Sequence, residues 1–350
     1  MSSVIHGSVT NEELATLGIE RAAILDLSSN LHPLGPDARV VEAIATAEVD
    51  HYPDPASEPL RSAIAEHEGL QPNQVLVTSG ATDAIHLVLR ALLAADDICA
   101  LFPPTFGEYE AAARLAGARV RHEQTTPPEF APNVELQSAA LAVLCNPNNP
   151  TGVYLDRDTI EHLVTNLRGT LVLDVAYDAF VEQPWHAEEL HRAGLPVLVI
   201  HSLTKLHSIP GLRLGYVTGP AGLLSRISTF QHAWPVGAPA IAAGQVALAL
   251  EDQRRADLPL IHQTLGQLRT TLEAAGIECA PSRANFLLAH VGDAPLFRGR
   301  LLREHGIVVR DCTSFGLPEW VRIAVPPASE TTRVIESLQA TLDAGAGAPG

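Results

Sequence analysis

Short apolar runs alternate with amphipathic segments through the middle of the chain, and this alternation indicates the fold. The apolar runs, which we take as candidate strands, are Val75–Val77, Ile98–Phe102, Arg119–Arg121, Leu141–Cys145, Leu171–Asp174, Val197–His201 and Leu214–Val217. The clearest helical pattern lies over Ala81–Ala95, where apolar residues recur at the i, i+3, i+4, i+7 spacing of one helix face. Strands that alternate with helices predict an α/β fold, in which helices cover both faces of a mainly parallel mixed sheet.

The two ends of the chain have different patterns. Residues 1–35 are rich in turn formers and predict an N-terminal arm with one short strand, Ile24–Leu27. Helices are expected over Asp37–Ala47 and up to His67, and a long helical pattern covers Ala238–Ala274. The strand patterns that follow lie near Ile277 and over Ala284–His290, Ile307–Arg310 and Trp320–Val325. We therefore predict an arm (1–35), a large domain (36–245), a smaller α+β C-terminal domain (246–343) and a disordered tail (344–350).

Composition narrows the classes of function. The 350 residues are 46% hydrophobic, which is enough apolar material for two domains. Aspartate and glutamate number 40 against 23 Lys and Arg, a net charge of −17 that argues against nucleic-acid and anionic-membrane partners. The four cysteines have neither metal-ligand nor disulfide-framework spacing, so we predict no metal site and a reducing compartment. No signal-peptide pattern and no membrane-length apolar run is present, which predicts a cytoplasmic protein.

Lys205 is the first candidate for chemistry, because it follows the apolar strand Val197–His201 in the segment Ser202-Leu203-Thr204-Lys205. Ligands of parallel α/β sheets bind at the carboxyl ends of the strands. A lysine amine can lose its proton there and form a Schiff base with an aldehyde. Ser202 and Arg213 are suited to hold an anion nearby. Taken alone, Lys205 is more typical of a surface residue that caps a strand, and only the composite segment favours chemistry.

Two other strand ends carry polar residues that suit a heterocyclic cofactor. Asp174 closes an apolar strand, and its carboxylate is costly to bury unless it pairs with a cation, such as a protonated pyridine nitrogen. Tyr177 and Asn149, the latter in the proline-rich turn Asn146–Gly152, are then expected to reach the phenolic oxygen of the same ring. A helix-capping aspartate and an ordinary loop are the alternatives.

Three further segments add candidate binding residues. Ser79–Asp83 opens a helix with small residues, an arrangement that favours a phosphate and lacks the glycine pattern of a nicotinamide dehydrogenase. Tyr109 follows the strand Ile98–Phe102 and is placed to lie over a flat cofactor. Arg322, inside an apolar strand, needs a carboxylate or phosphate partner, for which a substrate is one candidate. An ordinary helix cap, core packing and a structural salt bridge are the respective alternatives.

In this order, these segments resemble the fold-type I pyridoxal-phosphate enzymes, the aspartate aminotransferase superfamily, over nearly the whole chain. The resemblance implies pyridoxal 5′-phosphate as the cofactor. Lys205 would form the internal aldimine and move the proton at Cα, while Asp174 would pair with the pyridinium. Tyr109 would stack on the ring, whereas Tyr177 and Asn149 would contact its phenolic oxygen.

The same resemblance implies further roles. The residues that it assigns to the cofactor phosphate are Ala81, Thr82, Ser202 and Arg213. Tyr52, in Tyr-Pro-Asp-Pro, looks like the residue that reaches the cofactor phosphate of the partner subunit, which implies a homodimer. Arg322, Asn30 and His6 would hold the substrate.

Within the superfamily the chain is most similar to two groups. Gly80–Asp83, Asn146–Gly152, Ala284–Phe286 and Val309–Cys312 are similar to motifs of histidinol-phosphate aminotransferases. His6-Gly7, Leu27–Asn30, Pro33–Pro36 and Ile209–Arg213 resemble the threonine-phosphate decarboxylases of cobalamin synthesis. The implied function is transfer of an amino group from a small phosphorylated amine or amino acid to a keto acid, with decarboxylation as the alternative. Val175 stands where these families usually have glutamate.

A non-catalytic regulator on the same fold is a third alternative. Such a protein would carry an added DNA-binding domain and a basic face, whereas this chain is acidic and has only a short arm before the fold.

Overall fold

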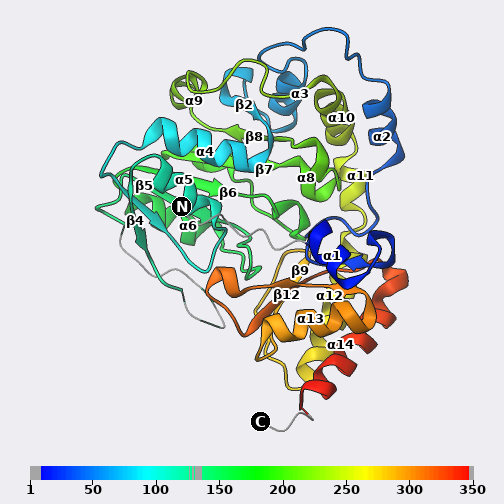
Figure 1. Cartoon of the computed structure of the whole chain (residues 1–350). Helices are drawn as coiled ribbons and strands as arrows, with labels where there is room; N and C mark the ends of the chain where they lie inside the picture. The colour runs from blue at the N-terminus through cyan, green and yellow to red at the C-terminus, as the bar shows by residue number, and fades with distance from the viewer. Residues whose placement is uncertain (1–8, 126, 128–129, 131–135, 347–350) are drawn as a thin grey trace.

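A seven-stranded sheet forms the centre of the protein, as a computed structural model shows for residues 9–125, 127, 130 and 136–346 (Figure 1). The strands are, in spatial order, β2 (Val75–Thr78), β8 (Gly215–Thr218), β7 (Val197–Ser202), β6 (Thr170–Asp174), β5 (Leu141–Cys145), β3 (Ile98–Leu101) and β4 (Arg119–His122). β8 runs opposite to the other six strands, which all share one direction. The predicted mainly parallel mixed sheet is therefore confirmed.

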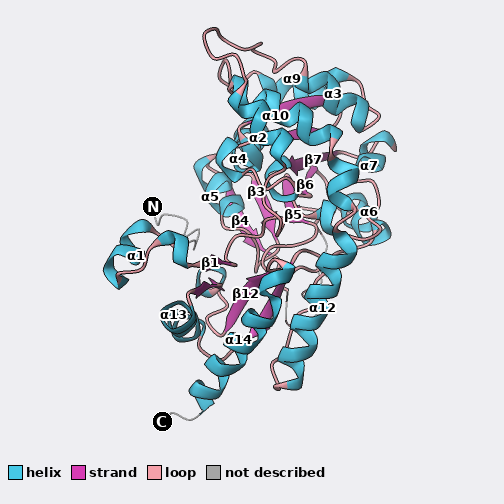
Figure 2. Ribbon diagram, turned by 90° about the vertical axis from the view of Figure 1, so that its right-hand side faces the viewer, coloured by secondary structure: helices cyan, strands magenta, loops and turns pink. Residues whose placement is uncertain are grey.

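Helices cover both faces of this sheet (Figure 2). One face packs on α4 (Gly80–Leu92), α5 (Glu108–Leu115) and α9 (Ala221–Ser228), and the other on α6 (Arg157–Thr165) and α7 (Glu188–Arg192). In β7, Leu198 and Ile200 join the first layer, while Val197 and Val199 join the second. Since successive strand residues point to opposite faces, a strand covered on both sides is apolar throughout, as the sequence pattern was.

Three more helices extend the large domain beyond β2. They are α2 (Ala38–Ala45), α3 (Leu60–His67) and α10 (Ala238–Ala249). Leu60 and Ile64 of α3 pack with Ile241 of α10 against the β2 residues Val75 and Val77.

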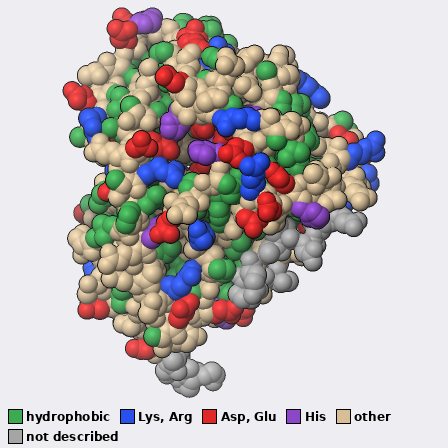
Figure 3. Space-filling model, turned by 180° about the vertical axis from the view of Figure 1, so that it is seen from behind, with side chains coloured by type: hydrophobic (Ala, Val, Ile, Leu, Met, Phe, Trp, Pro, Cys, Tyr) green, Lys and Arg blue, Asp and Glu red, His purple; other side chains and the backbone are tan. Residues whose placement is uncertain are grey.

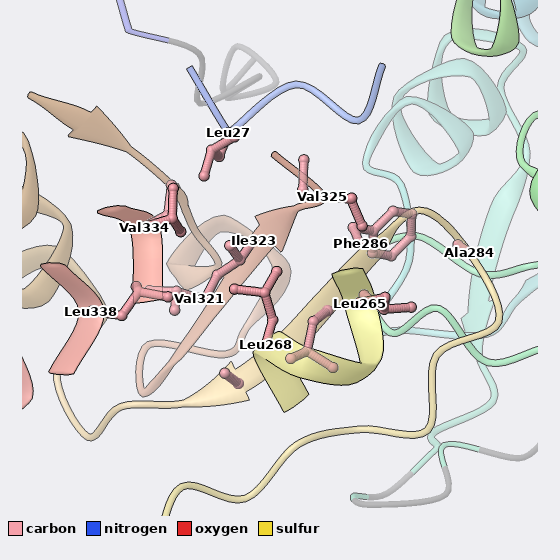
Figure 4. Close-up of a cluster of buried hydrophobic side chains, with 14 of the residues drawn as sticks. Leu27, Leu265, Leu268, Ala284, Phe286, Val321, Ile323, Val325, Val334 and Leu338 are labelled. Carbon is pink, nitrogen blue, oxygen red and sulfur yellow. The ribbon is translucent and has the colours of Figure 1, made fainter. Parts of the chain in front are cut away.

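A smaller unit lies below the large sheet in Figure 1. Its antiparallel sheet has the order β11 (Arg310–Asp311), β12 (Trp320–Ala324), β9 (Phe286–His290), and its helices are α12 (Leu258–Ala274), α13 (Ala294–His305) and α14 (Thr331–Ala346). The N-terminal segment joins this unit, since β1 (Leu25–Asp26) pairs in parallel with β10 (Ile307–Val308). Leu27 belongs to the same hydrophobic core as Ile323 and Val334 (Figure 4).

Several elements differ from the sequence expectation. The N-terminal segment contains a helix, α1 (Asn11–Leu17), which its turn-forming composition did not indicate. The long helical pattern after residue 238 is divided into α10, α11 (Glu251–Arg255) and α12. Pro259 lies in the first turn of α12 and has no N–H to continue a helix from α11, which explains the second break.

The C-terminal strands are shorter than expected. The strand near Ile277 is reduced to a single bridge between Cys279 and Ala289. The predicted disordered tail begins at residue 344, but α14 continues to Ala346, so the last helix is longer than expected. Residues 347–350 lie outside the described part of the chain. The domain boundaries at 35 and 245 stay predictions.

The surface carries charges of both signs. On the face shown in Figure 3, basic side chains lie among aspartate and glutamate side chains instead of forming one basic area. No helix in the described ranges is long and apolar enough to cross a membrane.

Candidate active site

The predicted functional segments meet at one edge of the large sheet. Thr78, at the end of β2, and Ser202, at the end of β7, both pair with Gly215. Asp174, at the end of β6, pairs with Cys145 of β5. Because these four strands run in the same direction, the segments that follow them emerge side by side.

Lys205 lies at this edge on α8 (Leu203–Leu206), directly after β7, and is half-buried. It is the single lysine of the chain, in which the other 22 of the 23 Lys and Arg residues are arginine. Its Nζ lies 5.7 Å from the centre of the Tyr177 ring. The Tyr177 hydroxyl accepts a hydrogen bond from Asn30 Nδ2 at 3.3 Å, so three predicted residues from distant segments come together.

Asp174 is buried, and the structure gives its carboxylate two hydrogen bonds. The Tyr109 hydroxyl donates to Oδ2 at 2.8 Å, and the Ala176 N–H donates to Oδ1 at 3.0 Å. Burial raises the pKa of Asp174 above its usual value, although these hydrogen bonds and the charges of His201 and Lys205 oppose that rise. A buried carboxylate in this environment is stabilised by an added cation, and a protonated pyridine nitrogen fits that requirement.

The sequence predicts that the Tyr109 ring lies over a flat cofactor, and the structure adds a contact of its hydroxyl group. Its side chain is fully buried, and its hydroxyl is directed at the Asp174 carboxylate. The sequence pattern therefore located Tyr109 at the site but did not reveal this hydrogen bond.

The predicted phosphate-binding residues surround the start of α4. Gly80 has φ +83°, and a Cβ there would lie 2.9 Å from Arg213 Nη2. A Cβ on Gly215 would lie 2.9 Å from the Ala81 nitrogen. These close approaches leave the N-terminus of the 13-residue helix α4 beside a guanidinium, an arrangement that suits an anion such as a phosphate.

The other residues of this set lie close by. Ser202 forms a hydrogen bond with the Thr204 hydroxyl at 2.8 Å, and Thr82 is in the first turn of α4. Arg213 is exposed and has a left-handed backbone with φ +53°.

Arg322 is buried in β12 and reaches into the same region from the smaller unit. Its Nη1 donates to Asn149 Oδ1 and its Nη2 donates to the Ser28 carbonyl at 2.6 Å. Its Nε and Asn30 Oδ1 are buried without a hydrogen-bond partner among the described residues. Such groups are costly to leave unpaired, so they are available to a bound polar ligand.

Arg310 is a second buried arginine, which sequence reasoning did not assign to the site. It lies in β11, directly opposite Arg322 in the antiparallel ladder, and is 3% exposed. Its guanidinium donates to Ser314 Oγ at 2.6 Å and lies 5.2 Å from the centre of the Phe315 ring. Burial, and next the charge of Arg322, lower the pKa of Arg310. The available signal was a charged residue directly after the apolar run Ile307–Val309.

One predicted residue, Tyr52, stands apart from this group, and another cannot be placed. Tyr52 is 76% exposed and stacks on Trp234 with ring centres 4.6 Å apart. His6 lies outside the described residues.

A buried cluster on the α7 side of the sheet is the best metal-ligand arrangement within the described ranges. Ligand atoms of Glu68, Glu188 and His201 lie within 4.8 Å of one another. His201 Nε2 pairs with Glu188 at 2.8 Å, and the Tyr216 hydroxyl donates to Glu68 at 2.6 Å. Burial disfavours both charges of the His201–Glu188 pair, but their attraction raises the pKa of His201 and lowers the pKa of Glu188. We interpret the cluster as a structural ion pair.

Comparisons with known proteins agree with this geometry. A family model described as aminotransferase class I and II matches residues 22–338. Histidinol-phosphate aminotransferase 1 of Thiobacillus denitrificans is 31% identical over 97% of this chain and 91% of that protein.

Two solved structures illustrate the similarity of fold. The L-threonine-O-3-phosphate decarboxylase of Porphyromonas gingivalis has a TM-score of 0.83 and 26% identity over 91% of this chain and 100% of that one. The histidinol-phosphate aminotransferase of Sinorhizobium meliloti, solved with pyridoxal-5′-phosphate, has a TM-score of 0.85 and 21% identity over 96% and 95% of the two chains.

Proposed function

Because this chain belongs to the aminotransferase class I and II family, whose cofactor is pyridoxal phosphate, we propose that it transfers the amino group of a small phosphorylated amine or amino acid to a keto acid. The observation that supports a phosphorylated substrate is the pair of buried arginines, Arg310 and Arg322, which lie opposite each other in the β11–β12 ladder. Of the two, Arg322 contacts Asn149 at the edge of the sheet that carries Lys205. The Arg322 Nε is buried without a hydrogen-bond partner among the described residues, and two neighbouring guanidinium groups together favour an anion there. A phosphate, with up to two negative charges, suits both.

The proposed reaction assigns a task to each residue of the site. Pyridoxal phosphate, when bound, takes up the electron pair that is released at the substrate Cα. Lys205 holds the cofactor and moves the proton at Cα, for which its half-buried position at the sheet edge is suited. Asp174 keeps the proton on the ring nitrogen. Tyr177 and Asn149 orient the ring through its phenolic oxygen, and Tyr109 covers it.

The remaining residues bind the two anions. Ala81, Thr82, Ser202 and Arg213 hold the cofactor phosphate at the start of α4. Arg322 and Arg310 hold the substrate anion, and Asn30 Oδ1, which is buried without a partner in the described part of the chain, accepts a substrate N–H or O–H. His6 is proposed as a further substrate contact from sequence alone.

Decarboxylation of a phosphorylated amino acid is the second candidate. The similarity to the threonine-phosphate decarboxylase of P. gingivalis, at 26% identity over its whole length, specifically favours it. The same arginines would then hold the substrate so that its carboxylate, instead of its Cα proton, is lost.

A paired substrate screen tests the proposal. Histidinol phosphate and histidinol, and O-phosphothreonine and threonine, are added to the enzyme loaded with pyridoxal phosphate. We expect a change in the cofactor spectrum only with the phosphorylated member of a pair. Amino transfer that requires a keto acid identifies the aminotransferase, and CO₂ release without a keto acid identifies the decarboxylase. A response only to plain dicarboxylic or aromatic amino acids would contradict a phosphorylated substrate.

Replacing Arg310 by glutamine is expected to raise KM for the phosphorylated substrate about ten- to a hundredfold, because one charge-assisted contact is lost. KM for the unphosphorylated analogue should change much less. Initial rates with the matched pair measure both values. Arg303→Gln, which changes an exposed arginine of α13, is the control. Equal changes for the two analogues would show that Arg310 does not contact the phosphate.

We also propose that two chains form a homodimer in which Tyr52 reaches the partner's cofactor phosphate. The exposed Tyr52–Trp234 stack supports this, because two large aromatic side chains exposed together are typical of an interface. Sedimentation velocity tests it, and a monomer that binds the cofactor fully would contradict it. A cytoplasmic location without nucleic-acid or membrane partners stays a prediction from composition.

A further inference from the structure

The helix that carries Lys205 is a single turn and cannot be stable by itself. α8 has four residues, so most of its backbone carbonyl groups accept no hydrogen bond from within the helix. The carbonyl of Thr204 accepts from the Ile209 N–H at 3.1 Å, and the carbonyl of Lys205 accepts from the His32 N–H at 3.0 Å. The position of Lys205 therefore depends on groups outside α8.

Arg254 provides the outside contact for the last residue of α8. Its Nε and Nη2 both lie 3.4 Å from the Leu206 carbonyl oxygen. Nη2 also donates to the Gly35 carbonyl at 2.8 Å. One guanidinium thus joins three segments that are far apart in sequence: α8, the segment around residues 30–35, and α11, the helix between the large domain and α12.

The same segment around residues 30–35 carries a residue of the proposed substrate site. Asn30 donates to the Tyr177 hydroxyl, and Ser208, just after α8, donates from its hydroxyl to the His32 carbonyl at 2.8 Å. The Arg254 contacts therefore help to fix Lys205 and Asn30 relative to each other.

Arg254 is well suited to this task. It is 6% exposed, and burial lowers its pKa, but a guanidinium remains charged at neutral pH. Its planar fork can donate to two separate carbonyl groups at once, which an ammonium on a flexible chain does less well.

We infer that Arg254 is a positioning residue for Lys205, holding the lysine-bearing turn against the Asn30 segment. The inference rests on the proposed function, since the contact between Arg254 and α8 matters for cofactor attachment only if Lys205 binds the cofactor. Arg254 itself is not expected to touch the cofactor or the substrate.

The test compares full-length wild type, Arg254→Lys and Arg254→Met with Arg255→Met as the matched control. Arg255 is on the same helix, is partly exposed, and pairs with Glu251 at 3.7 Å. Each protein is loaded with pyridoxal phosphate and reduced with borohydride. Intact mass gives the covalently attached cofactor, and alkaline release from unreduced samples gives the total. In wild type, Arg254→Met and Arg255→Met, Lys205 is the single lysine, so the added mass reports one side chain, apart from the N-terminal amine. Arg254→Lys carries a second lysine, so in that variant peptide mass mapping of the reduced protein counts only the cofactor attached to Lys205.

We expect the ratio of covalent to non-covalent cofactor to fall about tenfold in Arg254→Lys and at least as far in Arg254→Met, which is the change that loss of one charge-assisted hydrogen bond gives. Total binding should change less than about threefold, because the residues proposed to bind the phosphate are intact. Arg255→Met should match wild type.

A second measurement does not require the cofactor. Hydrogen exchange of the cofactor-free proteins should be about tenfold faster over residues 203–209 in Arg254→Lys, and unchanged in Arg255→Met. This keeps the inference testable if Arg254→Met does not fold. Wild-type ratios and wild-type exchange in Arg254→Lys would overturn the inference. Failure of the wild type to attach the cofactor would instead overturn the proposed function.

Discussion

Replacing Lys205 by alanine is expected to remove the visible absorption band of lysine-bound pyridoxal phosphate and to lower turnover at least about a thousandfold. The physical reason is that the chain has no other lysine side chain to hold the cofactor or to move the proton at Cα. Absorption spectra and initial rates with the substrate identified in the screen measure the two effects.

Lys205→Arg is the informative companion to this variant. It keeps a positive charge on α8, but a guanidinium stays protonated and cannot form the covalent link. We expect it to behave like the alanine variant in both assays. A visible band and turnover that survive in either variant would refute the assignment of Lys205.

Replacing Asp174 by asparagine is expected to lower kcat about a hundred- to a thousandfold at saturating cofactor, the range for loss of one preorganised electrostatic contact. Asparagine preserves the size of the side chain, but it removes the negative charge, and its one oxygen can accept only one of the two hydrogen bonds from Tyr109 and Ala176. The ring nitrogen then loses the group that keeps it protonated. Steady-state rates and the cofactor spectrum report the loss.

Asp178→Asn is the matched control for this prediction. Asp178 is a second acid four residues after Asp174, and burial raises the pKa of Asp178 to about 7, so its charge is partly suppressed in the native protein. We expect its replacement to change kcat less than about threefold. If both variants lose activity equally, the effect belongs to the loop and not to the charge of Asp174.

The elements of the large domain could be predicted because their patterns are local. β5 begins and ends where its apolar run does, at Leu141 and Cys145. Asp174 closes β6 and Lys205 follows β7, as expected. Burial on both faces makes each central strand apolar throughout, and this leaves a clear boundary where the polar residues begin.

The C-terminal part was harder to predict because its elements are short and depend on distant partners. β10 has two residues and exists through its pairing with β1, about 280 residues earlier in the chain. The sequence pattern did not reveal the break between α11 and α12. Pro259 lies in the first turn of α12, but in the sequence it falls inside one continuous helical pattern.

The residues of the candidate site show the same contrast between local patterns and long-range contacts. Lys205, Asp174, Tyr177 and Asn149 were predicted because each stands at or after the end of an apolar strand, and strand ends are where α/β proteins bind ligands. The hydrogen bond from Tyr109 to Asp174 joins residues 65 positions apart, and no local pattern encodes it. The same holds for Arg322 and Asn149, 173 positions apart.

By itself, then, the sequence determined the alternation of strands and helices, the mainly parallel sheet and the residues at its strand ends, because periodicity and strand termination are properties of neighbouring positions. Only the tertiary structure decided that Arg310 lies opposite Arg322 and that Arg254 reaches the carbonyl of Leu206. Strand register and long-range hydrogen bonds are fixed by how the whole chain packs, so they leave no periodic signal in the residues that make them.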